Sequence, residues 1–143
     1  MAEIPAPGPV AVSTPAAPPV TAALIAYGLF AVAGVAGLVS SGLHFIAPLF
    51  HLLGIIGVIV CYAKRGDAQG TWVAAHFTWL IRTFWFSLLW SIVGWFFFVV
   101  FFLVFLIGPI IAAVIWAVAF LWVLYRVIRG YLLFNQSKPV PAI

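Results

Sequence analysis

The chain has 143 residues, of which 67% are hydrophobic and only 6% are charged. A typical soluble domain carries roughly 25% charged residues, so the composition excludes a soluble domain and predicts a surface that faces lipid. The formal net charge is +4. The basic residues lie at the edges of apolar runs and form no stripe interleaved with polar residues, so nucleic acid is not an expected partner.

Residues 1–19 are expected to form a disordered, proline-rich tail. Six prolines lie within the first 20 residues, and each removes a backbone donor that a helix needs. The alanine, glycine and serine residues between them supply no core. We do not expect a signal peptide here, because no basic segment precedes an apolar stretch.

Four apolar segments are expected to cross the membrane within one helical domain over residues 20–134. The first covers residues 20–39 and has no charged residue, and about 20 residues is the length that crosses a hydrocarbon core of roughly 30 Å. The second covers 44–62. The fourth covers 109–127 and opens with Pro109, which suits a first helical turn. Small residues recur at helical spacing in or next to three spans, where they allow close helix packing: Ala33, Gly37 and Ser41, with Gly34 beside them; Gly54, Gly57 and Cys61; Ser87, Ser91 and Gly94.

The apolar run between Trp72 and Gly108 is too long for one span, because it would measure about 55 Å as a helix. Placing Arg82 at the centre of a bilayer would cost roughly 3 kcal/mol. We therefore expect an amphipathic helix on the membrane surface over residues 71–83, followed by the third span over 84–107. On a helical wheel the expected polar face contains Thr71, Trp72, His76, Thr78, Trp79, Arg82 and Thr83, and the expected apolar face contains Val73, Ala74, Phe77, Leu80, Ile81, Phe84 and Trp85. The predicted fold class is an all-α membrane protein with four transmembrane helices and one interfacial helix.

The positions of the basic residues predict the orientation. Lys64 and Arg65 lie between the second and third spans, and three further basic residues follow the fourth span. Four spans would place both regions on one side, and basic loops favour the cytoplasm. We therefore expect a multi-pass protein of a bacterial inner membrane, with a cytoplasmic N-terminus and a cytoplasmic end over residues 135–143.

Two stretches carry a resemblance to a known family. They are Tyr62 to Trp72, continued by His76-Phe77 and by Ile81 to Trp85, and Tyr125 to Gly130, followed by Asn135 and Lys138-Pro139. Over residues 46–139 the chain resembles a family of small bacterial inner-membrane proteins of unknown function. That family is distantly similar to the small four-span subunit of the chloroplast import translocon. The chain has Gln136-Ser137 where the family pattern implies an acidic, glycine-bearing turn.

The residues that could bind a metal or cofactor are few and scattered. His44 and His51 lie seven residues apart, about 10 Å along a helix, which is too far for one ion. His76 is expected near the opposite membrane face. Cys61 is the only cysteine, so it can form neither an intrachain disulfide nor a cysteine-based metal site. We expect no metal and no cofactor.

The sequence also gives no pattern typical of an enzyme or a transporter. Glu3 lies in the tail and Asp67 in a loop, so two carboxylates are not expected to flank a substrate. No serine and histidine occur with an evident third orienting group. None of the four expected spans contains Asp or Glu, whereas ion-coupled transporters usually hold acids inside the membrane. We expect no catalytic residue, and transport would require an oligomer of this short chain.

What remains is a cationic belt, by which we mean Lys64, Arg65, His76, Arg82, Arg126 and Arg129. The belt predicts contact with membrane lipids, including anionic lipids, or with a membrane-protein partner or another copy of the chain. Arg82 could stack on Trp79 or pair with Asp67, and Arg126 and Arg129 could face one phosphate together. The expected function is that of a non-enzymatic accessory or assembly subunit. The alternative is a subunit of an oligomeric transporter or translocation channel.

Overall fold

The computed structural model describes residues 17–39, 47–105 and 107–141, with side chains at all of these positions except 38–39, 47–51 and 101–105. Most of the expected tail, the residues between the first two expected spans and His44 lie outside the described residues, as does the side chain of His51. The described chain forms four α-helices: α1 Val20–Val39, α2 Ala47–Lys64, α3 Val73–Phe105 and α4 Gly108–Asn135.

Three of these helices contain segments long and apolar enough to cross a membrane: Val20–Gly37, Val73–Val100 and Gly108–Asn135. In α2 the apolar segment with described side chains, Leu52–Lys64, is shorter. The expectation of an all-helical membrane protein is therefore confirmed, whereas the count of four spans stays a prediction. The bounds of α1 coincide with the first expected span, and α4 continues eight residues beyond the predicted end of the fourth, at residue 127.

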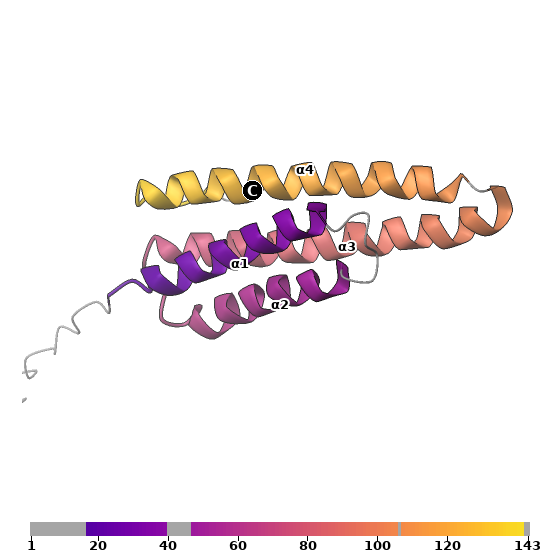
Figure 1. The fold of residues 1–143 in the computed structure, drawn as a ribbon. Helices are drawn as coiled ribbons and strands as arrows, with labels where there is room; N and C mark the ends of the chain where they lie inside the picture. Colours follow the sequence, from indigo (N-terminus) through magenta and orange to yellow (C-terminus); the bar gives the residue numbers. More distant parts are fainter. Residues whose placement is uncertain (1–16, 40–46, 106, 142–143) are drawn as a thin grey trace, which may run out of the picture.

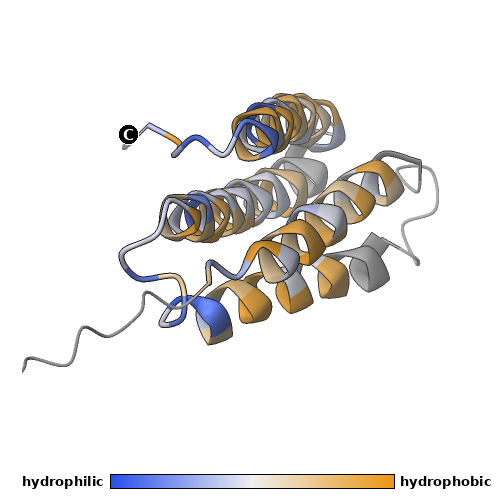
Figure 2. Cartoon of the chain, turned by 90° about the vertical axis from the view of Figure 1, so that its left-hand side faces the viewer, coloured by the Kyte–Doolittle hydropathy of each residue, from blue (hydrophilic) through white to orange (hydrophobic). Residues whose placement is uncertain are grey.

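The helices pack as two antiparallel pairs of unequal length. α1 and α2 form one pair, which lies against one half of the longer pair made by α3 and α4 (Figure 1). α3 has 33 residues and measures about 50 Å, whereas α1 has 20 residues and measures about 30 Å. The other half of the α3–α4 pair therefore extends beyond α1 and α2. We call the end where α1 and α3 begin and α2 and α4 end the polar end, because hydrophilic residues gather there (Figure 2).

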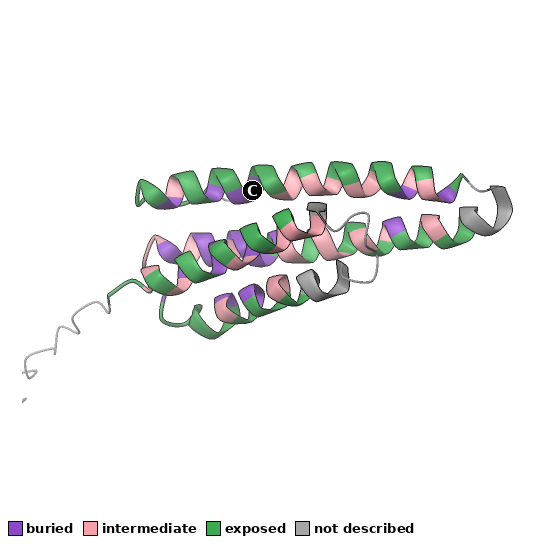
Figure 3. Cartoon of the chain, viewed as in Figure 1, coloured by how far each residue is buried: buried purple, intermediate pink, exposed green. Residues whose placement is uncertain are grey.

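The core lies in the half of the molecule where all four helices meet. Ala26 and Tyr27 of α1, Cys61 of α2, and Phe77 and Leu80 of α3 belong to one buried cluster, together with residues of α4. The outward surfaces are largely exposed and apolar on all four helices (Figure 3), as a lipid-facing surface would be. In the extended half of the α3–α4 pair, close packing depends on Gly94, where an added Cβ would meet the indole of Trp116.

The expected break between an interfacial helix and a third span is absent, because α3 is one continuous helix. No glycine or proline interrupts the sequence between Trp72 and Ser91, so nothing there ends the helix. The expected polar face is also wrong in part. His76 and Thr83 are fully buried and Trp79 is nearly so, because α1, α4 and the C-terminal segment supply partners for them. Arg82 is exposed, as expected for a residue at a membrane surface.

Candidate functional site

Our candidate site is a buried polar cluster near the polar end, made of Tyr27, His76, Trp79, Thr83 and Arg126. α1, α3 and α4 all contribute to it. Three of its residues, at positions 76, 79 and 83 of α3, are spaced so that they share one face of that helix, the face that meets α4. Within the described part of the chain, no buried side-chain nitrogen or oxygen lacks a hydrogen-bond partner.

His76 joins three segments that are far apart in the sequence. Its Nδ1 lies 2.9 Å from the hydroxyl of Tyr27, and its Nε2 lies 2.8 Å from the carbonyl oxygen of Lys138. A carbonyl oxygen can only accept, so Nε2 carries the proton, and in the neutral ring Nδ1 accepts from Tyr27. The ring of Phe134 packs edge-on against the imidazole, with centroids 5.3 Å apart. His76 thus holds α1 and the C-terminal segment against α3.

The C-terminus of α4 directs the Lys138 carbonyl towards His76. The amide of Lys138 donates to the Leu133 carbonyl at 3.0 Å, and the amide of Ser137 donates to the Phe134 carbonyl at 2.9 Å. These two bonds form a Schellman motif. The motif places Ser137 in the left-handed region, at φ 52°, where glycine is the favoured residue. The turn therefore has the geometry of a glycine-bearing turn although its sequence contains none.

Arg126 is buried among neutral groups. Its Nε donates to the hydroxyl of Thr83 at 2.8 Å. Its guanidinium carbon lies 3.6 Å from the ring centroid of Trp79 and 4.9 Å from that of Trp122. Trp79 in turn donates from its indole nitrogen to the Arg126 carbonyl at 3.0 Å. Two aromatic faces and one hydroxyl stabilise the cation, but none of these groups carries a negative charge.

The charge around Arg126 is raised further by Arg82. The two residues lie close enough for their positive charges to interact. The whole chain has six Lys and Arg residues but only two Asp and Glu residues. Asp67 is already bonded to Lys64, with 2.8 Å between Nζ and Oδ2. The cluster therefore lies in a region of surplus positive charge.

The six residues of the cationic belt do not form one surface. His76 and Arg126 both belong to the buried cluster but have different partners, and Arg82 lies near Arg126. Lys64 and Arg65 are exposed at the end of α2 and in the following loop. Arg129 is exposed and donates to the Tyr125 hydroxyl at 2.6 Å. Arg126 and Arg129 thus have different partners, because Arg126 stacks on Trp79 and Arg129 bonds Tyr125. The expected contacts of Arg82 with Trp79 or Asp67 stay predictions. Among the described residues, no three His, Cys, Asp or Glu side chains gather as metal ligands would.

Sequence reasoning missed three residues of this region. Tyr27 is one of only two polar side chains in α1, and a tyrosine hydroxyl inside an uncharged span was a usable signal. Thr83 and Trp122 gave no such signal, because their roles depend on the pairing of α3 with α4. The buried position of Arg126 also needed that pairing, since sequence alone placed this residue at the headgroups.

The chain and its contacts identify an integral membrane protein with a cationic cluster towards one end. No family model, no curated protein and no solved structure matches the chain.

Proposed function

We propose that the chain is a non-enzymatic accessory or assembly subunit of a bacterial inner membrane, and that it binds anionic lipid at the Arg82–Arg126 region. The observation that supports this proposal is a buried guanidinium whose contacts are Thr83, Trp79 and Trp122, all of them neutral. A buried charge is costly unless an opposite charge or strong hydrogen bonds compensate it. The chain has six Lys and Arg residues against two Asp and Glu residues, and Asp67 is bonded to Lys64, so the compensating negative charge is expected to come from outside the chain.

Anionic headgroups are the nearest source of negative charge for a membrane protein. They attract basic residues near the surface by about 1 kcal/mol each, and guanidinium groups bind phosphate through paired donors. The level of the cluster fits such contact. Arg82 lies nine residues after the start of α3, and Arg126 lies nine residues before the end of α4, so both are about 14 Å from the polar end. On the side of these arginines away from the polar end, residues 83–105 of α3 and 108–125 of α4 carry no charged side chain, and the two helices are long enough to cross the hydrocarbon.

The test is native mass spectrometry of protein extracted in mild detergent. We expect wild-type protein to retain anionic phospholipid and a variant with Arg82→Gln and Arg126→Gln to lose most of it. The matched control is Arg65→Gln with Lys138→Gln, which removes the same number of positive charges from exposed positions outside the cluster. Because these two residues do not contact the cluster through their side chains, the control should keep most of the lipid.

Equal lipid retention by all three proteins would contradict the proposal. Co-purification of an acidic membrane protein that the Arg82→Gln, Arg126→Gln variant loses, with no anionic lipid, would assign the cluster to a protein partner instead. A homo-oligomer that conducts ions or moves a substrate in vesicles would favour the alternative of a transporter or translocation subunit.

A further inference from the structure

A line of side-chain contacts runs from the polar cluster into the apolar half of the molecule. It follows the α3–α4 seam, by which we mean the surface where these two helices face each other. On α3 the residues that face the seam recur every three or four positions, from Trp79 through Thr83 and Phe86 to Trp90. On α4 they run in the opposite direction, from Arg126 through Trp122 and Ala119. The rings of Phe86 and Trp122 meet edge-on, with centroids 5.9 Å apart. One line of contacts therefore connects the Arg126 guanidinium to the centre of the helix pair.

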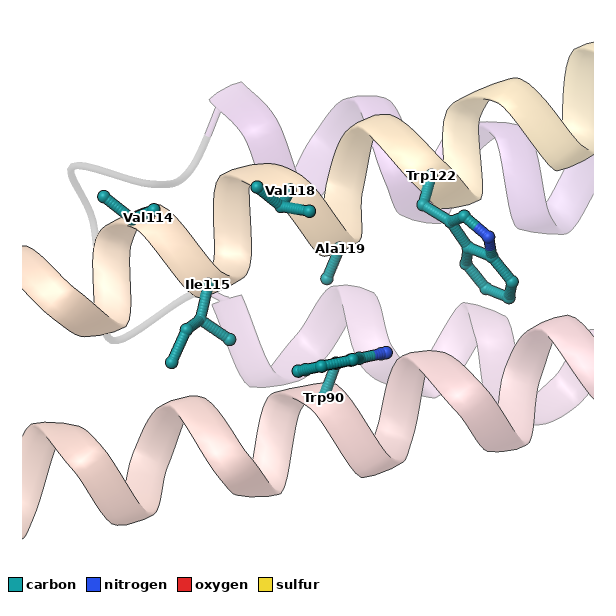
Figure 4. Close-up of a pocket in the computed structure, with 6 residues that line it drawn as sticks. All are labelled: Trp90, Val114, Ile115, Val118, Ala119 and Trp122. Carbon is teal, nitrogen blue, oxygen red and sulfur yellow. The ribbon is translucent and has the colours of Figure 1, made fainter.

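Beyond Trp122 this seam opens into a groove of about 370 Å³, lined by Trp90, Val114, Ile115, Val118, Ala119 and Trp122. In Figure 4 the rings of Trp90 and Trp122 flank it, and the small side chain of Ala119 points into the space between the two helices. Apart from the two indole N–H groups, the lining side chains are hydrocarbon, so they offer no hydrogen-bond acceptor and no charge. Such a groove fits a hydrocarbon chain and does not fit a polar ligand.

The depth of the groove matches one leaflet of a bilayer. Arg126 and Ile115 lie eleven residues apart on α4, which corresponds to about 16 Å. Half of a hydrocarbon core of roughly 30 Å is about 15 Å. A phosphate held near Arg126 would therefore place its own acyl chain beside Trp122, Ala119 and Ile115. Trp122 belongs to both sites, because its indole lies beside the Arg126 guanidinium and the residue also lines the groove.

We infer that the seam from Arg126 to Ile115 is a binding site for one anionic phospholipid, with its phosphate at the Arg82–Arg126 region and one acyl chain in the groove between Trp90 and Trp122. This inference rests on the proposed function, because the same arginines hold the headgroup. It adds that recognition requires the acyl chain as well as the charge. Charge complementarity at one end of an apolar groove selects a lipid over a soluble phosphate or an uncharged hydrocarbon.

The experiment uses the full chain in phosphatidylcholine vesicles that contain a small fraction of phosphatidylglycerol carrying a diazirine in the middle of one acyl chain. After illumination, mass spectrometry locates the cross-linked residues. We expect labels to concentrate at residues 114–122 and around Trp90. A phosphatidylcholine probe with the same diazirine chain should label these positions several-fold less. Labels spread evenly around both helices would overturn the inference.

The matched variants are Ala119→Phe and Ala117→Phe, two identical changes on one helix. Ala119 lines the groove, whereas Ala117 is exposed and is not part of the lining. Ala119→Phe should reduce labelling several-fold and Ala117→Phe should leave it unchanged. Ala119→Leu, a smaller filler, should give an intermediate yield, and circular dichroism should show the same helix content for all variants. Wild-type yield from a folded Ala119→Phe protein would overturn the inference.

Two further arms separate this inference from the proposed function. Excess glycerol phosphate, which has the charge but no chain, should not compete with the probe, and competition would show that the headgroup binds without the groove. Native mass spectrometry of Ala119→Phe should show a loss of anionic lipid. Retained lipid in this variant, together with loss in the Arg82→Gln, Arg126→Gln variant, would overturn the groove and keep the proposed function. A dimer that Ala119→Phe dissociates would assign the groove to a second copy.

Discussion

At the scale of single residues, the polar cluster depends on side chains that each serve two partners. His76 bonds Tyr27 with one nitrogen and the Lys138 carbonyl with the other. The Thr83 hydroxyl accepts from Arg126 and donates to the Trp79 carbonyl at 2.7 Å. Removing one member therefore leaves a buried group without a partner, and that loss costs more than the net gain of a single hydrogen bond.

The first residue-scale prediction concerns Tyr27→Phe. The change keeps the buried ring but leaves Nδ1 of His76 without its donor, so the free energy of unfolding should fall by about 1–3 kcal/mol. Tyr125→Phe is the control, because that hydroxyl is bonded to Arg129 at the surface, where water can replace it. Thermal unfolding of both variants in detergent measures the difference. Equal stability of Tyr27→Phe and wild type would show that the His76–Tyr27 bond contributes nothing.

At the scale of helices, some glycines allow two helices to pack closely, whereas others have no neighbour that requires a glycine. An added Cβ at Gly57 would approach Cε2 of Phe30 to 2.9 Å, so this glycine sets the contact between α2 and α1. Gly94 does the same between α3 and α4, against Trp116. Gly28 has no such neighbour, since nothing lies within 4 Å of its added Cβ. The same residue type thus has opposite consequences at different positions.

These environments predict opposite signs for the same substitution. Gly28→Ala should stabilise the protein by about 0.5–1 kcal/mol, because alanine restricts the unfolded chain and favours helix. Gly94→Ala should destabilise it by about 1–3 kcal/mol, because Trp116 must move out of its place. The unfolding midpoints of the two variants in one detergent give the comparison. A stabilised Gly94→Ala protein would contradict the close approach of Gly94 to Trp116, and would mean that α3 and α4 are farther apart at this point than the structure shows.

At the scale of the whole molecule, the polar cluster joins the first half of the chain to the second. Tyr27, His76 and Lys138 meet near one end, where the loop after α2 also lies. We therefore expect the loop between α2 and α3 and the C-terminal segment to lie on the same side of a membrane. The basic residues in that loop and after α4 favour the cytoplasm as this side.

Reporter fusions test this arrangement and its orientation together. Fusions after Ala63 and after Lys138 should both report the cytoplasm, because Ala63 lies at the end of α2 and Lys138 just after α4, and both helices end at the polar end. A fusion after Gly108, at the far end of the α3–α4 pair, should report the periplasm. Opposite compartments for Ala63 and Lys138 are incompatible with the contact between His76 and the Lys138 carbonyl. A cytoplasmic signal at all three positions would mean that α3 and α4 do not cross the membrane.

The sequence predicted the features that depend on local pattern, such as helix bounds. It did not predict the features that depend on which helices pack together. The uncharged run of α1 predicted both ends of that helix, and Pro109 predicted the start of α4 to within one residue. The wheel placed Arg82 at the surface correctly, but it also exposed His76, because no local pattern shows that a tyrosine 49 residues away will bond to it. The division of α3 was inferred from its length, from the cost of placing Arg82 in the bilayer and from the helical wheel. These grounds gave the wrong result because none of them shows that half of a helix extends past its neighbours.

That extension gives the protein two hydrophobic walls that do not coincide. On the side of α1 a bilayer meets an uncharged wall of about 30 Å that starts at the polar end. Along α3 it meets an uncharged wall of about 35 Å that starts after Arg82, about 14 Å from that end. No flat bilayer matches both, so the lipids must thin or thicken around the molecule unequally, or the helices must tilt, at a cost of fractions of a kcal/mol per Å of mismatch. The deformation has a direction, set by the face that α1 and α2 cover. Its energy changes with the length of the surrounding acyl chains, so the protein is expected to partition between membrane regions of different thickness and to prefer neighbours that share its deformation.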